Sequence, residues 1–368
     1  MTERRRLHDA RPGIPDNSGV RYAHWILVAL LGIAAVPFAS AETRLDHGGT
    51  TVPQHEDIVA AGPLGALGGT LTIPAEEGPL ADEVPVLLIV PGSGPTDRDG
   101  NSPLGISAAP YRLLAEALAE RGYPSVRIDK RGMFGSAGAI TDPNDVTISA
   151  YGDDLVSWTR AIRMRLPSQE GVRCVVPLGH SEGGLIALAS LPRLPDACGL
   201  ILISSLGRPF DAVLRAQLHA NPANAAVLDE ADRAIAQLKQ GARVDAGALS
   251  PALQPIFSTE VQGFLIDAFS YDPVALAAEV EVPMLVIQGM RDLQVGEADA
   301  RALASAAPEA TLALLPEVNH VLKVVDSDDR SANLATYSDP ALPIASSVVD
   351  AVTQYLERAP RRAPAERP

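Results

Sequence analysis

A serine between glycines is the feature of this sequence best suited to chemistry. The pentapeptide Gly179-His180-Ser181-Glu182-Gly183 joins an apolar run, 172–178, to a run of small and apolar residues, 184–190. A strand that turns through G-x-S-x-G into a helix exposes the serine hydroxyl at the tip of the turn. The unpaired N–H groups of the helix start favour developing negative charge there. The pattern therefore predicts that Ser181 is a nucleophile.

A serine nucleophile needs a base within hydrogen-bond reach and an acid that orients this base. After a turn of this type, the acid and then the histidine follow, each just behind a later strand. Asp292 and His320 each follow a short apolar run typical of a buried strand, and His320 is the only one of the seven histidines in a suitable place. Glu317 is the other acidic candidate, but it lies too close to His320 in the chain to reach the ring easily. We therefore expect Ser181, Asp292 and His320 to be the catalytic residues.

A glycine-rich loop follows the apolar run 84–90. Acyl transfer needs two backbone N–H donors aimed at the oxyanion, one from the residue after the nucleophile and one from the loop after the third strand. The sequence predicts the N–H groups of Glu182 and Ser93, with Gly92 and Gly94 allowing the main chain to approach the substrate. A phosphate-binding loop is disfavoured, because neither G-x-G-x-x-G nor a Walker lysine motif is present.

Charged residues Asp97, Arg98 and Asp99 continue this loop. They could select a charged substrate, or Arg98 could hold the loop in place through a carboxylate such as that of Asp129. We favour the second interpretation. Lys130 and Arg131 are open to the same two interpretations.

Five motifs occur in a fixed order along the chain. They span residues 91–101, 129–136, 179–184, 288–295 and 319–320. Together they resemble the α/β hydrolase superfamily, and within it a bacterial esterase branch that carries the loop G-S-G-P-T-D-R-D-G-N. The resemblance covers about residues 56–356. It implies a serine carboxylesterase of unsettled natural substrate.

Strand-like and helical segments alternate along most of the chain, which predicts a mostly parallel central sheet flanked by helices. Amphipathic patterns predict helices over 108–121, 149–166 and 343–358. We therefore predict an α/β hydrolase core made of residues 42–205 and 276–358.

Residues 206–275 interrupt the alternation with three helical patterns, over 210–219, 224–240 and 255–269. In this fold an insertion after strand 6 forms a helical cap that excludes water and shapes the pocket. A purely structural insertion is the alternative. The cap residues expected to line a substrate pocket are Phe257, Phe264, Phe269 and Tyr271.

The N-terminus has the pattern of an export signal. Five arginines precede an apolar run, 25–38, and Ala39-Ser40-Ala41 is an A-x-A cleavage pattern. The run is short for a membrane span. Residues 1–41 are therefore predicted to be a signal peptide, which leaves a periplasmic or secreted enzyme without a membrane span; an uncleaved anchor is the alternative. The tail 359–368 has no apolar stripe and is expected to be disordered.

The two cysteines, Cys174 and Cys198, each open an apolar run that reads as a strand. If these strands are parallel neighbours, the two residues come within disulfide range, and an exported protein meets an oxidising environment. Two buried free thiols are the alternative.

Composition excludes several classes of function. A net charge of −15 gives no basis for binding a phosphate backbone, and 4% aromatic residues are too few for a base-stacking platform. Nucleic-acid partners are therefore not expected. No metal site is expected either, because H-x-x-x-H, H-E-x-x-H and clustered Cys/His spacings do not occur.

These features predict a serine hydrolase that cleaves small-molecule carboxylic esters through an acyl-enzyme and needs no cofactor. A thioesterase or peptidase with the same triad is the nearest alternative. A catalytically silent binding protein on a hydrolase scaffold is a further alternative, disfavoured because all three triad residues are present.

Overall fold

Eight strands form one sheet in the order β1-β2-β4-β3-β5-β6-β7-β8. The computed structural model describes residues 52–75, 84–167 and 174–358, so the predictions for 1–41 and 359–368 lie outside the described residues. The strands are β1 (Gln54–Ala61), β2 (Ala66–Ile73), β3 (Val86–Val90), β4 (Ser125–Ile128), β5 (Val175–His180), β6 (Leu200–Ile203), β7 (Met284–Gly289) and β8 (Thr311–Leu315). Strand β2 is antiparallel to β1 and β4, and the other pairs are parallel. The predicted mostly parallel sheet is confirmed.

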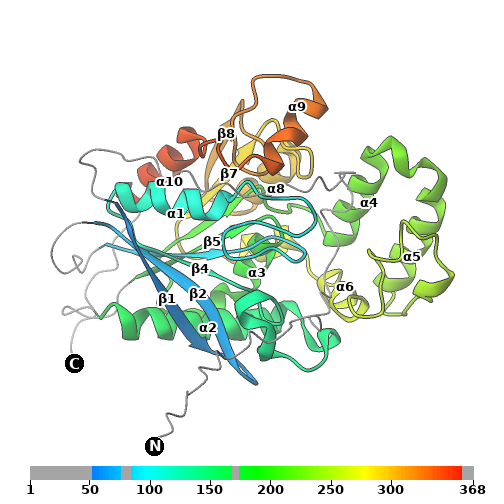
Figure 1. Cartoon of the computed structure of the whole chain (residues 1–368), viewed down its shortest axis with the longest axis horizontal. Coiled ribbons are helices and arrows are strands. Elements are labelled where there is room, and N and C mark those ends of the chain that lie inside the picture. Colours follow the sequence, from blue (N-terminus) through cyan, green and yellow to red (C-terminus); the bar gives the residue numbers. More distant parts are fainter. Residues whose placement is uncertain (1–51, 76–83, 168–173, 359–368) are drawn as a thin grey trace, which may run out of the picture.

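Helices cover both faces of this sheet (Figure 1). They are α1 (Pro110–Glu120), α2 (Ile148–Arg165), α3 (Glu182–Ser190), α4 (Phe210–Ala220), α5 (Leu228–Lys239), α6 (Gln262–Ala268), α7 (Pro273–Ala278), α8 (Glu297–Ala306), α9 (Arg330–Ala335) and α10 (Ser346–Arg358). Helices α1 and α10 pack on one face, and α2, α3 and α8 pack on the other. None of the helices within the described ranges has the length and apolar character needed to cross a membrane.

The central strands are apolar along their whole length because both of their faces are covered. In β3, Leu87 and Ile89 join the cluster formed with α1 and α10, whereas Val86, Leu88 and Val90 face the opposite layer. This alternation is the two-residue period of a strand. Since β3, β5, β7 and β8 run parallel, their carboxyl ends meet at one edge of the sheet, where the predicted site residues follow them.

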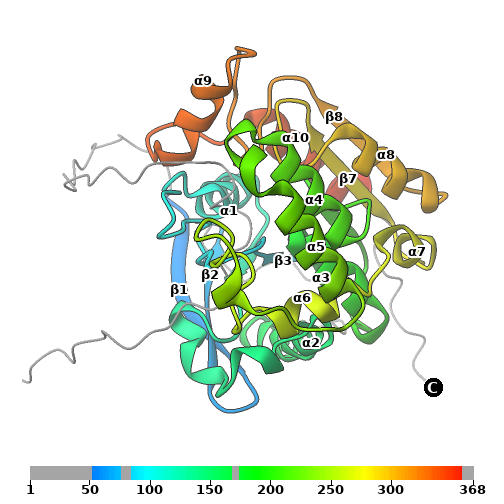
Figure 2. The same cartoon turned by 90° about the vertical axis from the view of Figure 1, so that its right-hand side faces the viewer.

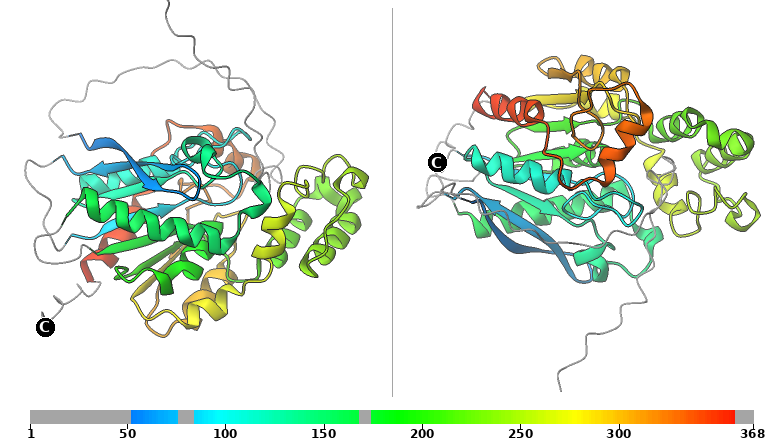
Figure 3. Two further views of the ribbon diagram at one scale, coloured as in Figure 1. Left: turned by 90° about the horizontal axis from the view of Figure 1, so that it is seen from below. Right: turned by 45° about the horizontal axis from the view of Figure 1, so that its top comes forward.

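Helices α4, α5 and α6 occupy the stretch between β6 and β7 and lie together at the edge of the sheet reached by the loop after β3 (Figures 1 and 2). Two further views show the same group projecting from the sheet-and-helix layers (Figure 3). The third helix is shorter than predicted, since it begins at Gln262 and not at residue 255. The Gln262 amide donates to the carbonyls of Val244 and Phe257, which stabilises turns in the preceding segment.

The insertion is attached to the core by polar contacts at several points. Near its start, Arg208 binds both carboxylate oxygens of Asp299 in α8, each at 2.8 Å. In α6, Asp267 accepts a hydrogen bond of 2.7 Å from the N–H of Ile148 at the start of α2. These contacts hold both ends of the insertion against helices that cover the sheet.

Cys174 and Cys198 form a disulfide in the structure, with their Cα atoms 5.7 Å apart. Cys174 directly precedes β5 and Cys198 lies two residues before β6, and these strands are parallel neighbours. The bridge therefore joins the amino ends of two central strands, and it resolves the choice between a disulfide and two free thiols in favour of the disulfide.

Replacing both cysteines by serine should lower the free energy of unfolding by about 3 kcal/mol, because the cross-link restricts a loop of this length in the unfolded chain. Denaturant unfolding of the wild type and of Cys174→Ser/Cys198→Ser measures the difference. Reductant should shift the midpoint of the wild type alone. Equal midpoints for the oxidised wild type and the double variant would contradict the prediction.

Candidate active site

Ser181 lies at a strained turn between β5 and α3. Its φ of 54° and ψ of −122° are unfavourable for a residue with a side chain. The flanking glycines are needed for packing, because a Cβ at Gly179 would lie 2.4 Å from the carbonyl oxygen of Gly183. A Cβ at Gly183 would lie 2.2 Å from that of Val90. The glycine spacing of the sequence thus forms the sharp strand-to-helix turn expected of a nucleophile elbow.

His320 and Asp292 form a hydrogen bond of 2.8 Å between Nδ1 and Oδ2, although they are 28 residues apart. The side chain of Asp292, which follows β7, is buried, and its other oxygen accepts the N–H groups of Gln294 and Val295. Burial alone would raise the pKa of Asp292, but the interaction with His320 and these hydrogen bonds outweigh it and lower the pKa. The carboxylate therefore stays ionised beside the ring. Glu317, the other acidic candidate, is exposed.

A chain of three hydrogen bonds connects the His320 loop to the serine turn and to the loop after β3. The Gly92 N–H donates to the Tyr111 hydroxyl at 3.1 Å. Tyr111 is 2.9 Å from Nδ1 of His180, and Nε2 of His180 is 2.9 Å from the His320 carbonyl oxygen. Because a carbonyl only accepts, Nε2 carries the proton and Nδ1 accepts from Tyr111. The rings of His180 and His320 lie 4.6 Å apart, which brings His320 to the residue preceding Ser181.

His180 is neutral in the folded protein. Burial, followed by the nearby His320, lowers its pKa from the ordinary 6.5 to about 3. A protonated ring would also lose the acceptor that holds Tyr111. The chain of hydrogen bonds therefore requires the uncharged form that burial favours.

The folded protein resists protonation of His180 and the unfolded chain accepts it. The contribution of this ring to stability is therefore complete above pH 6.5 and decreases as the pH falls, by at most about 1.4 kcal/mol per pH unit. We expect His180→Gln, whose amide can still donate to the His320 carbonyl, to be less stable at pH 7 but to lose stability less steeply between pH 6.5 and 4.5. Urea unfolding at several pH values tests this. Parallel pH dependences for the two proteins would refute it.

The loop after β3 lies directly against the serine turn. A Cβ at Gly92 would lie 3.2 Å from the Cβ of Ser181, so only glycine allows this approach without adjustment. The adjacent Ser93 donates from its hydroxyl to Oε2 of Glu182 at 2.7 Å. Glu182 is the first residue of α3, where the N–H has no acceptor within the helix. The structure thus places Ser93 and Glu182, the residues predicted to supply the oxyanion donors, beside the turn of Ser181.

The charged residues of this loop are used in holding it. Arg98 donates to Asp129 from Nε at 2.9 Å and from Nη2 at 2.6 Å. Asp97 accepts the N–H of Asp99, and the Asp99 carboxylate pairs with Arg127. The interpretation that Arg98 holds the loop through Asp129 is confirmed.

The aromatic residues expected to line a pocket contribute to the hydrophobic core. Phe257 and Phe264 are fully buried and Phe269 nearly so, and Tyr271 packs against the same cluster. The Phe264 ring lies 6.0 Å from that of Tyr151 in α2. These contacts attach the insertion to the core, and a role in substrate binding stays a prediction.

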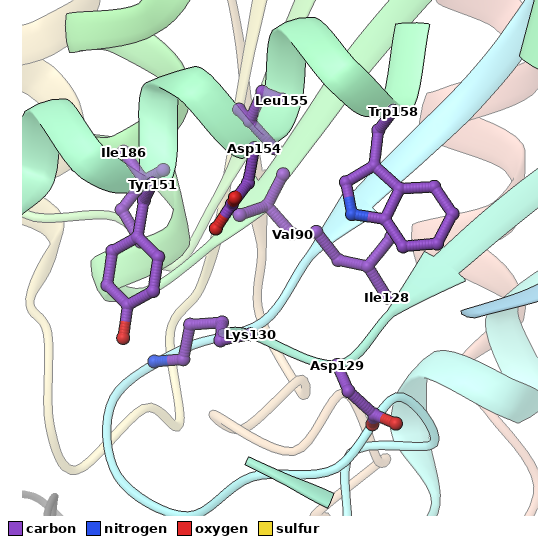
Figure 4. Close-up of a pocket in the computed structure, with 9 residues that line it drawn as sticks. All are labelled: Val90, Ile128, Asp129, Lys130, Tyr151, Asp154, Leu155, Trp158 and Ile186. Atoms are coloured by element: carbon purple, nitrogen blue, oxygen red, sulfur yellow. The ribbon is translucent and has the colours of Figure 1, made fainter. Parts of the chain in front are cut away.

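A small cavity lies behind the serine turn, between α2, α3 and the ends of β3 and β4 (Figure 4). It is lined by Val90, Ile128, Asp129, Lys130, Tyr151, Asp154, Leu155, Trp158 and Ile186. None of the four predicted pocket aromatics is among them.

Two contributors to the site were missed by reasoning from the sequence. Tyr111 was expected only as part of a helix, and for Lys130 both substrate selection and a structural role were left open. Each forms a hydrogen bond with a residue far away in the chain, Tyr111 with His180 and Lys130 with Glu182. The spacing of residues within one segment cannot predict such a contact. An aromatic hydroxyl in the first turn of a predicted helix was the only signal available for Tyr111.

A sheet with this strand order, with a serine at a strained turn behind β5 and a bonded acid and histidine behind β7 and β8, is the arrangement of an α/β hydrolase. Residues 104–326 match the family described as "Serine aminopeptidase, S33". This match covers more than half of the chain, which therefore belongs to that family. The matched region includes Ser181, Asp292 and His320 and begins just after the loop 91–101.

Individual relatives are more distant. The chain is 27% identical over 248 residues to esterase EstD of Thermotoga maritima, a match that covers 67% of this chain and 54% of that protein. It thus spans about half the length of this relative. It is 28% identical over 235 residues to RutD of Caulobacter sp. (strain K31), a carbamate hydrolase by name, covering 59% of this chain and 81% of the relative.

Solved structures support the fold. The Pyrococcus furiosus esterase Pf2001 superposes with a TM-score of 0.52 at 15% identity, covering 86% of this chain and 96% of that one. At this identity the likeness concerns the fold alone.

Proposed function

We propose that the protein is a serine hydrolase that cleaves carboxylic esters of small molecules through an acyl-enzyme, and that it belongs to the esterase branch with the G-S-G-P-T-D-R-D-G-N loop. The observation that carries the proposal is the 2.8 Å hydrogen bond between His320 and Asp292, beside the strained turn of Ser181. Membership in a family of serine hydrolases and the name of the Thermotoga relative, an esterase, support it.

In the proposed mechanism Ser181 attacks the ester carbonyl while Nε2 of His320 takes its proton. Asp292 holds the proton on Nδ1, which leaves Nε2 as the base, and its ionised carboxylate stabilises the imidazolium that forms. The N–H groups of Ser93 and Glu182 bind the oxyanion. His320 then returns the proton to the departing alcohol. A water molecule, activated by the same ring, cleaves the acyl-enzyme and restores Ser181. None of these steps uses a cofactor.

The same residues could cleave a thioester or an amide, since these reactions differ in the leaving group and not in the nucleophile. The family description names an aminopeptidase, and one relative is a carbamate hydrolase by name, so amide substrates belong in any test. We further propose that the enzyme works outside the cytoplasm. The disulfide supports an oxidising compartment, in agreement with the export signal predicted for residues 1–41.

Ser181→Ala should lower ester turnover by roughly 10⁴-fold or more, because the nucleophile is removed while the fold is kept. His320→Ala should behave in the same way, and Asp292→Asn should be less severe but still strongly impaired, because it disturbs the tautomer and not the base itself. The measurement is kcat/KM on a panel of p-nitrophenyl esters, thioesters and aminoacyl anilides.

Labelling by a fluorophosphonate, mapped by mass spectrometry, serves as the control. The wild type should label at Ser181 and Ser181→Ala should not. Undiminished ester turnover in Ser181→Ala would refute the proposed function. An unlabelled and inactive wild type would favour a silent hydrolase scaffold.

A further inference from the structure

A buried ion pair lies directly below the loop that follows β3. Lys130 Nζ is 2.9 Å from Oε1 of Glu182, and each side chain is only 2% exposed. Burying two charges costs several kcal/mol per ion before their attraction is counted, so an ion pair of this kind is weak evidence of a role in stability. Its position at the start of α3, one residue after Ser181, calls for another explanation.

Both members of the pair also bind the loop, at consecutive residues. Lys130 donates to the carbonyl oxygen of Gly92 at 2.6 Å. Glu182 accepts from the hydroxyl of Ser93 at 2.7 Å. Lys130 therefore binds one side of the Gly92–Ser93 peptide, through Gly92, and Glu182 binds the other, through Ser93.

The Gly92–Ser93 peptide is trans, as are all peptide bonds in the described part of the chain. In a planar trans peptide the C=O and the N–H point in opposite directions. By binding the Gly92 carbonyl, Lys130 directs the N–H of Ser93 away from itself. A cation on the carbonyl also polarises the amide, which makes its N–H a stronger donor. This N–H is one of the two donors proposed for the oxyanion.

Other charges nearby are already paired. Asp129 binds Arg98, and Asp154 binds Arg131 at 2.6 Å. Figure 4 shows the ammonium group of Lys130 pointing away from Asp129, toward Tyr151. It lies 5.5 Å from the centroid of the Tyr151 ring. The hydrogen bonds of Lys130 therefore go to Glu182 and to the Gly92 carbonyl of the loop.

We propose that Lys130 is a positioning residue for the oxyanion, acting through Gly92 and Glu182. It orients and polarises the N–H of Ser93, and its charge offsets the Glu182 carboxylate, which would otherwise repel the oxyanion held by the N–H of the same residue. Both side chains are buried, each only 2% exposed, so little water can screen these charges. The inference rests on the proposed serine hydrolase mechanism and deepens it.

Lys130→Met keeps the length of the side chain but releases the Gly92 carbonyl and leaves the Glu182 carboxylate uncompensated. Loss of one oxyanion donor lowers kcat by about 10²- to 10³-fold. We therefore expect kcat to fall on the order of 10²-fold with KM changed by less than about threefold. A trifluoromethyl ketone analogue of the best ester, which binds as an oxyanion adduct, should weaken in step with kcat/KM.

Lys130→Met/Glu182→Gln separates the two effects and leaves no unpaired buried charge, so it tests the inference even if the single variant does not fold. Its kcat should exceed that of Lys130→Met about tenfold, because the repulsive charge is gone. It should stay about tenfold below the wild type, because the Gly92 carbonyl is still unheld. These are order-of-magnitude expectations that divide the loss between orientation and charge.

Arg131→Met is the matched control. It breaks the neighbouring buried pair with Asp154; the hydrogen bonds that Arg131 donates go to Asp154 and Ala150 in α2 and not to the loop. Its thermal stability should fall as in Lys130→Met, while kcat at a temperature where both are folded should stay within about threefold of the wild type.

Wild-type kcat in folded Lys130→Met or in the double variant would overturn the inference, as would equal losses of kcat in Lys130→Met and Arg131→Met. Unchanged binding of the trifluoromethyl ketone would do the same. Absence of Ser181-dependent turnover in the wild type would instead reject the proposed function, and it would be seen before any Lys130 variant is compared.

Discussion

The candidate site depends on the two hydrogen bonds made by the neutral ring of His180. It stands directly before Ser181, donates to the loop that carries His320, and accepts from Tyr111, which in turn binds Gly92. Three loops that follow β3, β5 and β8 are thereby tied to one imidazole. A charged ring could not accept from Tyr111. Burial of an ordinary titratable residue in its uncharged form thus fixes the relative positions of the groups proposed to react.

Charge at this edge of the sheet is arranged in separate pairs. Arg98 pairs with Asp129 and Arg131 pairs with Asp154, while Asp292 accepts a hydrogen bond from His320. Each pair links elements that are distant in the chain, and the low polarity around them makes a missing partner costly. Lys130 and Glu182 follow the same rule, but theirs is the pair that also contacts the Gly92–Ser93 peptide.

Local sequence patterns were sufficient to predict the parallel strands from β3 onward, the main helices and the serine turn, but they did not predict β1 and β2. Ser181 could be located because a strained turn needs glycines at fixed positions around it. Asp292 and His320 could be located because parallel strands place whatever follows them at a common edge, and their hydrogen bond agrees with that expectation. The acid and the base were found by topology and not by any motif of their own.

The parts that sequence could not predict are contacts between side chains far apart in the chain. Tyr111 lies 69 residues from His180, and Lys130 lies 52 residues from Glu182. Nothing in either local pattern distinguishes these partners from core or surface residues. The start of α6 was missed for a similar reason, because the Gln262 side chain stabilises turns where helical spacing continues.

The charged loop after β3 bears on the kind of substrate that the site can accept. Its charged residues could select a charged substrate. In the structure, however, Asp97, Arg98 and Asp99 each form a hydrogen bond or an ion pair with a neighbouring group. A charged substrate would have to compete with these partners and would disrupt the loop that holds Ser93. Because these charges are already paired, they favour an uncharged acyl group in the proposed ester hydrolase, and selection among esters by side chains of the insertion between β6 and β7 stays a prediction.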